Sequence, residues 1–273
     1  MKITVKTIIT SMFCMFALIA AAQTTDTVTA QTADTPAAQT TGTAESQSPE
    51  RAFQLSFITP LGTNGIDSHL ITNKVSINIL GGYSYGNLFC ELGGLYNVNL
   101  HLTKGFSAAG LFNYSGKTED AVQLAGLFNI STDGNASAQI GGITNIAKKS
   151  TFQLNGISNI TTGTTDTQIS GILNIAKEVN GLQLGLINYA EDMNGVPIGL
   201  ISFVKNGKGK PEFEIGFSDS LNTFISFKFG INKFYTIFSG GINYIDNPTF
   251  MAYGFGLGTQ MDWADGWGSQ IEL

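Results

Sequence analysis

The feature that most constrains the fold of this chain is a short phrase that returns eight times between Glu91 and Val204. Each copy is a glycine, two further residues and an asparagine, except that the last copy ends in serine. The copies begin at Gly94, Gly110, Gly126, Gly142, Gly156, Gly171, Gly185 and Gly199. Successive asparagines, or the final Ser202, are 16, 16, 16, 14, 15, 14 and 14 residues apart. Self-similarity at a nearly fixed period predicts one structural unit that is repeated along the chain.

Five copies carry a glutamine upstream of the glycine. These residues are Gln123, Gln139, Gln153, Gln168 and Gln183. Because side chains alternate between the two faces of a strand, the six-residue spacing in four copies places glutamine and asparagine on one face. Gln183 and Asn188 are only five residues apart, so the register shifts in that copy, and a bulge could absorb the shift. The spacing is not helical and glycine recurs inside each segment, so we predict strands throughout.

The segments on either side of the repeats alternate more regularly. Over residues 52–58, 75–83, 224–232 and 251–263, large apolar residues occupy every second position, with small or polar residues between them. An apolar face toward lipid and a polar face toward a lumen are typical of membrane barrel strands. We therefore predict an all-β fold, an antiparallel meander closed into a transmembrane-type β-barrel of roughly 14–16 strands. In that barrel Gln and Asn line the lumen, and residues such as Leu124 and Phe227 face lipid.

The same period permits an alternative, a parallel β-solenoid of eight short coils with flanking strands. Nearly equal steps suit stacked coils, and one asparagine per coil would form a ladder. Outer-membrane barrels usually alternate short turns with long loops, which these repeats lack. Against the solenoid, the flanking segments alternate without the repeat phrase, and a coil of 14 residues is tight. The barrel is the main prediction, and the solenoid is kept as the alternative.

The chain divides into three parts. Residues 1–22 combine Lys2 and Lys6, an apolar run and a close of small residues, which predicts a secretory signal peptide. Residues 23–50 are rich in Thr, Gln and Ala and lack aromatic residues, so we predict a disordered leader. Residues 51–273 form the repeat-containing β domain, with the repeats at about 88–206.

The repeat phrase, the closing segment 195–207 (GVPIGLISFVKNG) and the entry segment 57–65 (FITPLGTNG) together resemble a family of uncharacterised bacterial surface-repeat proteins. The resemblance covers residues 52–273 and implies an exported protein of the outer-membrane type. It implies no catalytic or ligand-binding residues. Members of that family continue beyond the position equivalent to Leu273, so the sequence is expected to be truncated.

Composition and motifs argue against most chemistry. Removing residues 1–22 takes two of the 14 basic residues and none of the 20 acidic ones, and the resulting net charge of −8 disfavours nucleic-acid binding. Cys90 is then a lone cysteine and makes no internal disulfide. Ser84 stands in a Gly-x-Ser-x-Gly phrase, but a strand is predicted to follow where a hydrolase needs a helix. His69 and His101 are far apart in the sequence, without ligand spacing for zinc.

We therefore predict no catalytic, cofactor-binding or metal-binding residues, no cofactor, and a protein that is not an enzyme. The predicted function is a structural or passive-pore role at the bacterial outer membrane or cell surface, with the lipid bilayer as partner. The alternative is a surface-exposed solenoid that acts as an adhesin or binding scaffold for a protein or glycan. Trp263, Trp267, Tyr244 and Phe250 are candidates for an interfacial aromatic girdle or, equally, for ordinary core packing.

Overall fold

The computed structural model describes residues 48–207, 211–245, 248–263 and 268–273. These residues form a 15-stranded sheet, a 5-stranded sheet and a short 3-10 helix, η2 (Gly65–Leu70). The predicted all-β fold is confirmed. The predicted signal peptide and nearly all of the predicted leader lie outside the described residues. Within the described ranges, no helix has the length and apolar character needed to cross a membrane.

The strands follow one another closely along the chain. In the first sheet they are β1 (Glu50–Ile58), β2 (Leu61–Gly62), β3 (Thr72–Ser84), β4 (Gly86–Gly93), β5 (Tyr96–Ala109), β6 (Phe112–Ala125), β7 (Phe128–Ser131), β8 (Gly134–Gly141), β9 (Thr144–Ala147), β10 (Lys149–Asn155), β11 (Ser158–Ser170), β12 (Leu173–Leu184), β13 (Ile187–Met193), β14 (Val196–Ile198) and β15 (Ile201–Val204). In the second sheet they are β16 (Glu212–Gly216), β17 (Thr223–Ile231), β18 (Phe234–Asn243), β19 (Phe250–Asp262) and β20 (Gly268–Glu272).

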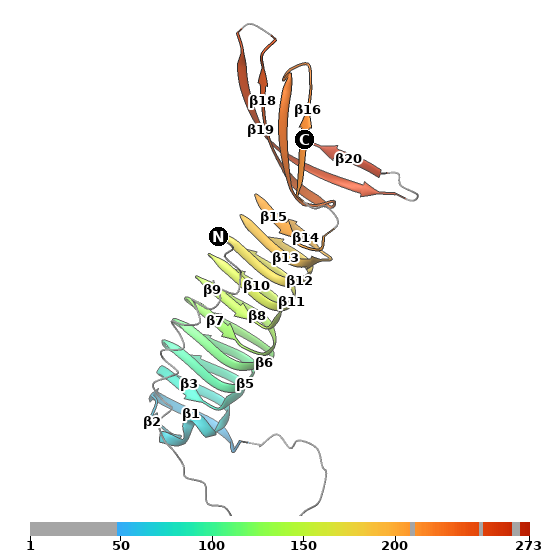
Figure 1. Cartoon of the computed structure of the whole chain (residues 1–273). Helices are drawn as coiled ribbons and strands as arrows, with labels where there is room; N and C mark the ends of the chain where they lie inside the picture. Colours follow the sequence, from blue (N-terminus) through green and yellow to red (C-terminus); the bar gives the residue numbers. More distant parts are fainter. Residues whose placement is uncertain (1–47, 208–210, 246–247, 264–267) are drawn as a thin grey trace, which may run out of the picture. The chain divides into compact units, whose positions relative to one another are not determined.

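The first sheet is a parallel β-solenoid, so the predicted antiparallel barrel is wrong and the stated alternative fits. Apart from the short hairpin between β1 and β2, every pairing in this sheet is parallel. Figure 1 shows its strands stacked in chain order from β1 to β15. The segments 52–58 and 75–83, predicted as barrel strands, belong to β1 and β3, which pair in parallel as part of the same stack.

Each coil of the solenoid consists of two strand segments, joined at one side by the glycine turn and at the other by a turn or, as in β6 and β12, within one continuous strand. In one coil, β7 carries Asn129 and β8 carries Gln139, and the glycine turn at Gly142 leads into the next coil. The pairing places each asparagine on the asparagine of the neighbouring coil, such as Asn129 on Asn145, and each glutamine on the next glutamine. A repeat of constant length produces this register only when coils stack in parallel, which is why the period selects the solenoid.

The repeated glycine is required by the close stacking of the turns. A Cβ atom on Gly142 would overlap the carbonyl oxygen of Gly126 in the coil before it, and a Cβ atom on Gly126 would overlap that of Gly110. The same holds for Gly156 above Gly142 and for Gly171 above Gly156. These glycines are therefore needed for close approach of two backbones and not for a left-handed backbone conformation.

The second sheet, β16 to β20, is an antiparallel meander in chain order. Its alternation follows the predicted pattern, since Ile225 and Phe227 are exposed and Ser226 is buried. The antiparallel part of the prediction thus applies to this sheet, within the described residues, and not to the repeats.

Candidate binding surfaces and the polar interior

A ladder of asparagine side chains runs through the interior of the solenoid. Its members are Asn97, Asn113, Asn129, Asn145, Asn159, Asn174 and Asn188. Each is at most 1% exposed, and Nδ2 donates to Oδ1 of the next asparagine at 2.9–3.1 Å until Asn188 donates to Ser202 Oγ at 3.3 Å. The second N–H of Asn129 donates to the carbonyl oxygen of Ile140 at 2.8 Å, and the other members make equivalent bonds. Because a carbonyl only accepts, this bond fixes the nitrogen, and the ladder donates toward the C-terminus.

A second ladder, built from glutamines, donates in the opposite direction. Nε2 of Gln139 donates to Oε1 of Gln123 at 2.8 Å, and the same distance recurs from Gln153 to Gln139, from Gln168 to Gln153 and from Gln183 to Gln168. All of these side chains are fully buried. The next position in the column is Pro197, which has no side-chain amide, and Gln183 Oε1 has no partner among the described residues.

Replacing Gln153 with leucine should lower the free energy of unfolding by about 1–3 kcal/mol. Leucine approximately fills the space, but Gln139 Oε1 would lose the Nε2 donor of Gln153, and Thr161 Oγ1 would lose the acceptor at 2.9 Å. Denaturant unfolding followed by circular dichroism would measure the change. The control Thr151→Leu, at an exposed position of the same strand, should stay within about 0.5 kcal/mol of the native chain. Equal effects of the two substitutions would mean that the ladder does not stabilise the coils.

The glutamine column contains one carboxylate near its N-terminal end. Glu91 on β4 is paired with Ser107, which is paired in turn with Gln123. Its carboxylate is fully buried and accepts hydrogen bonds from Asn99 Nδ2 at 2.6 Å, Asn78 Nδ2 at 3.3 Å and Ser107 Oγ at 3.4 Å. Burial raises the pKa of Glu91 to about 7, and the three hydrogen bonds oppose that shift without cancelling it. Aligning Glu91 with the glutamine column would have identified this site from the sequence.

The outer surface of the coils near the glycine turns is apolar, and three stacked columns form what we call the apolar strip. The turn column consists of Leu111, Leu127, Ile143, Ile157, Ile172, Leu186 and Leu200. The column on the asparagine strands consists of Tyr114, Ile130, Ile146, Ile160, Ile175, Tyr189 and Phe203. The column on the glutamine strands consists of Leu124, Ile140, Leu154, Ile169, Leu184 and Ile198. These side chains are half-buried or exposed, up to 53% for Leu186.

The opposite edge of the coils carries the charge. It is formed where each asparagine segment leads to the glutamine segment, either by a turn or within a continuous strand such as β6 or β12. We call it the charged edge, and it holds Lys117, Glu119, Asp120, Asp133, Lys148, Lys149, Asp166, Lys177, Glu178, Glu191, Asp192 and Lys205. These are all the charged residues between positions 106 and 205. Exposed ion pairs connect several of them, such as Lys117 to Glu119 at 2.9 Å and Lys148 to Asp133 at 3.5 Å. The solenoid is therefore amphipathic across its width.

A shallow groove of about 510 Å³ continues the apolar strip toward the N-terminal coils. Its lining includes the small residues Gly93, Ala108 and Ala109 and the larger Leu92 and Leu124. Ala108 lies in the column that carries Leu124 in the next coil, so the groove exists because a small residue replaces a large one. A groove of this lining favours an aliphatic ligand.

The second sheet presents a row of phenylalanines on one face. Phe213, Phe227, Phe238 and Phe255 are paired across β16, β17, β18 and β19, with ring centroids 5.2 Å apart in the first pair and 5.4 Å apart in the last. Tyr253 on the same face is 97% exposed. Phe213, Phe227 and Phe255 are 57%, 48% and 58% exposed, whereas Thr236 on the same face is buried and its hydroxyl donates to the carbonyl oxygen of Leu200 at 2.8 Å.

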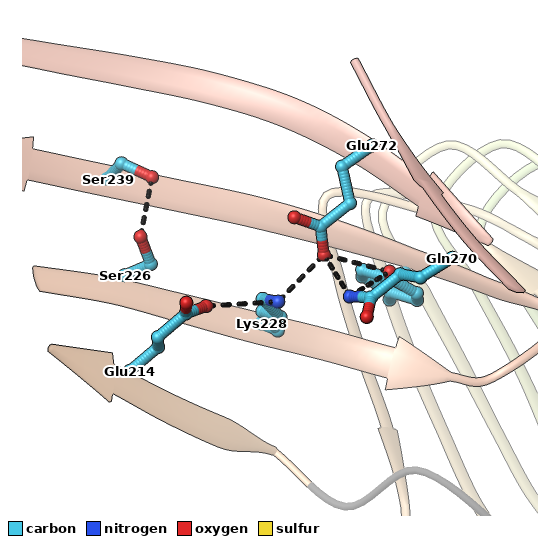
Figure 2. Close-up of polar contacts among 7 residues, drawn as sticks. Glu214, Ser226, Lys228, Ser239, Gln270 and Glu272 are labelled. Carbon is cyan, nitrogen blue, oxygen red and sulfur yellow. Dashed lines mark hydrogen bonds and ion pairs between the residues drawn. The ribbon is translucent and has the colours of Figure 1, made fainter. Parts of the chain in front are cut away.

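The other face of the second sheet carries a polar cluster, shown in Figure 2. Lys228 Nζ lies 2.7 Å from Glu272 Oε1 and 3.1 Å from Glu214 Oε2, and the Tyr235 hydroxyl donates to Glu272 at 2.9 Å. Burial alone would lower the pKa of Lys228, but Glu272 and Glu214 outweigh it and raise the pKa. Because Glu272 on β20 reaches Lys228 on β17 although β18 and β19 lie between them in strand order, the sheet curls toward this polar face. The phenylalanine row is therefore on the convex side.

The residues considered for catalysis and metal binding are not brought together. Ser84 is buried and donates to Asn99 Oδ1 at 2.6 Å, and the chain continues into strand β4 without a helix. His69 lies in η2, whereas His101 lies in β5 and stacks on Tyr85 with ring centroids 5.1 Å apart. Cys90 is half-buried and free. Among the described residues, no group of three or more His, Cys, Asp or Glu could hold a metal ion.

The aromatic candidates lie on the surface of the second sheet. Tyr244 and Phe250 flank the connection from β18 to β19, whereas Trp263 follows the other end of β19. All three are exposed, at 57%, 46% and 65%, so core packing does not describe them. Trp267 lies outside the described residues.

Comparison with protein-family models, with curated proteins and with solved structures found no match to this chain.

Proposed function

We propose that this chain is an exported, non-catalytic binding scaffold of the bacterial cell surface, and that the apolar strip is its binding surface. The observation that carries the proposal is the separation of charge and apolar surface across the solenoid. Between positions 106 and 205 every charged residue lies on the charged edge, and none lies in the apolar strip. The passive-pore role depended on the closed barrel, and it falls with the barrel.

The strip is unusual for a surface that meets only water. Soluble monomers rarely expose contiguous apolar patches of more than a few hundred Å², and larger patches mark interaction sites. In this solenoid the positions that point inward are filled mainly by Asn, Gln, Ser, Thr and Ala, with Glu91, Val179 and Val204 as the larger exceptions, while Leu, Ile and Phe point outward. Most large apolar residues are thus placed on the outer surface, where a partner can contact them, and not in a core.

Export and the absence of catalysis rest on other features. The basic, apolar and small-residue pattern of residues 1–22 supports secretion. The polar groups inside the coils are engaged in amide ladders, and Lys228 is held between two carboxylates. These groups stabilise the fold, which leaves the outer surface as the functional part of the molecule.

Lysine substitutions in the turn column should release the protein from the cell envelope. The triple variant Ile157→Lys, Ile172→Lys and Leu186→Lys places charges at exposed positions of the apolar strip. We expect the native chain, expressed with its own N-terminal segment, to sediment with the envelope, and at least about ten-fold more of the triple variant to remain in the supernatant. Immunoblots of the fractions would measure the ratio.

The matched control adds the same number of lysines to the opposite edge, as Thr132→Lys, Thr162→Lys and Asn180→Lys. These positions are exposed, so the control variant should fold and fractionate as the native chain does. Circular dichroism on all three proteins would establish that the coils are intact. If the strip variant is folded and remains with the envelope to the same extent as the control, the proposed function is wrong.

A further inference from the structure

We infer that the partner of the apolar strip is a lipid bilayer, with the strip among the acyl chains of one leaflet and the charged edge in water. The inference rests on the proposed function, because it identifies what the same surface binds. Its first support is the composition of the strip. The three columns contain Leu, Ile, Phe and Tyr only, without a charged or amide side chain from Leu111 to Phe203.

The shape of the strip fits a fluid partner better than a rigid one. Its outer columns lie on the two opposite walls of the coil, on the asparagine strands and on the glutamine strands, and the turn column joins them. The strip therefore covers three sides of a narrow, convex edge. Two copies of such an edge meet along a line, whereas a stable protein interface buries about 800 Å² on each partner. Lipid chains conform to a convex surface and cover all three sides.

The solenoid also meets the main physical condition for contact with hydrocarbon. No water is present there, so backbone N–H and C=O groups must be paired within the protein. Parallel pairing from coil to coil satisfies them along the repeats, for example between β10, β11 and β12. Inside the coils, the asparagine and glutamine ladders pair the side-chain amides with one another. The coils thus present few unpaired polar groups to the apolar phase.

The second sheet shows the same arrangement in a different architecture. It curls toward the cluster of Lys228, Glu214 and Glu272, and it presents Phe227 and Phe255 on its convex side. In water a two-faced sheet covers its apolar face and leaves its polar face exposed. Both sheets of this chain do the reverse. An apolar environment around the protein would explain the outward apolar faces of both sheets.

The groove beside Ala108 adds a more local feature. Its lining combines the small residues Gly93, Ala108 and Ala109 with Leu92 and Leu124, and its volume is about 510 Å³. An acyl chain is narrow, flexible and apolar, and it can enter a recess that a protein side chain reaches only with a matching position. We therefore expect an acyl chain of the contacted leaflet to occupy the groove.

The charge of the molecule predicts which lipids are needed. The charged edge mixes both signs, with five lysines and seven acidic residues from Lys117 to Lys205, so it offers no basic patch for anionic headgroups. Binding should depend on the apolar strip alone. We expect the protein to bind vesicles of phosphatidylcholine, and we expect added salt or anionic lipid to change that binding less than two-fold, roughly.

Vesicle flotation with the purified chain tests the inference. Phosphatidylcholine vesicles contain no protein, so flotation of the native chain identifies lipid as a sufficient partner. The triple lysine variant should float at least about ten-fold less, and the charged-edge control should float as the native chain does. Depth is measured with lipids brominated in their acyl chains, which should quench the added fluorescence of Ile157→Trp and leave that of Thr162→Trp unchanged.

The outcomes separate this inference from the proposed function. Failure to float, together with envelope association that still requires the strip, would replace lipid with a protein partner and leave the scaffold function standing. Self-association that the strip lysines abolish, without flotation, would make a second copy of the chain the occupant. Flotation that survives the strip lysines would assign lipid binding to another surface. Loss of both flotation and envelope association in the native chain would overturn both proposals.

Discussion

Replacing Glu91 with glutamine is expected to raise the free energy of unfolding by about 3 kcal/mol at pH 9 and to change it little at pH 4. The folded-state pKa of Glu91 is about 7, against 4.5 for the free side chain, because the carboxyl group is buried among neutral partners. The folded state therefore holds its proton more tightly than the unfolded state. The contribution of the protonated Glu91 carboxyl to the free energy of unfolding is fully present below pH 4.5. It falls as the pH rises toward 7 and is absent above pH 7.

Glutamine removes this pH dependence while keeping the shape of the side chain. It restores the residue type that occupies the column from Gln123 onward. The new amide nitrogen would lie beside Asn78, whose Oδ1 has no partner among the described residues. Urea unfolding of the native chain and of the variant at both pH values would measure the difference. If the variant gains the same free energy of unfolding at pH 4 and at pH 9, ionisation of Glu91 is not the cause of the difference in stability.

A matched control removes a carboxylate from the charged edge. Glu178→Gln changes the net charge by the same amount at a half-exposed position, where water and Thr164 surround the side chain. It should not reproduce the gain at high pH. A gain in both variants would mean that the overall negative charge, and not the burial of Glu91, weakens the fold at high pH.

Replacing Gly142 with alanine should lower the free energy of unfolding by about 3 kcal/mol or more. The added Cβ atom would occupy the space of the Gly126 carbonyl oxygen, and a backbone atom cannot move aside as a side chain can. The turn would have to separate from its neighbour, and the pairing of β7 with β9 would be disturbed at the same point. Thermal and denaturant unfolding followed by circular dichroism would report the loss.

Gly240→Ala is the control for this substitution. Gly240 lies in β18, and a Cβ atom there would meet nothing within 4 Å. Alanine at this site should be neutral or stabilise the sheet by up to about 1 kcal/mol, because it reduces the freedom of the unfolded chain. If Gly142→Ala is as well tolerated as Gly240→Ala, close stacking of the glycine turns is not what requires glycine.

The sequence allowed the faces of the strands to be predicted, but not their pairing. Gln139 and Asn145 were placed on one face and the apolar residues on the other, and the burial of both side chains confirms this. Alternation along a strand is the same in an antiparallel barrel and in a parallel coil. The two folds differ in which strand lies beside which, and a pattern with a period of two residues contains no information on that neighbour.

Polar residues on one face of a strand and apolar residues on the other are typical of a lumen and a lipid surface, so the alternation alone favours the barrel. In the solenoid the same polar residues fill the space between the two walls of a coil, where Asn129 and Gln139 bond to the coils above and below. A constant repeat length with an asparagine at one position in every copy was the signal for this arrangement. For the choice between the two folds, this constant repeat is stronger evidence than the regular alternation of the flanking segments.

The five-residue spacing between Gln183 and Asn188 predicts a register shift, which a bulge could absorb. Both residues nonetheless occupy their columns, with Gln183 paired to Gln168 and Asn188 paired to Asn174. The missing residue is removed from the turn, where Gly185 no longer lies against the carbonyl oxygen of Gly171 and meets Asn174 and Ser170 instead. Turns can change length at small cost, whereas a column of buried amides cannot change register without leaving its members unpaired.

The opposite directions of the two amide ladders bear on the electrostatics of the whole stack. Every amide is a dipole, and a ladder that donates toward one end adds its dipoles along the axis, as peptide groups do in a helix. The asparagine ladder donates toward the C-terminus and the glutamine ladder toward the N-terminus, so their contributions oppose each other in every coil that has both. Further coils that add one asparagine and one glutamine therefore add little net side-chain dipole along the axis. In a medium of low dielectric constant, where such a dipole is weakly screened, this cancellation reduces the electrostatic cost that the two ladders add as the solenoid lengthens.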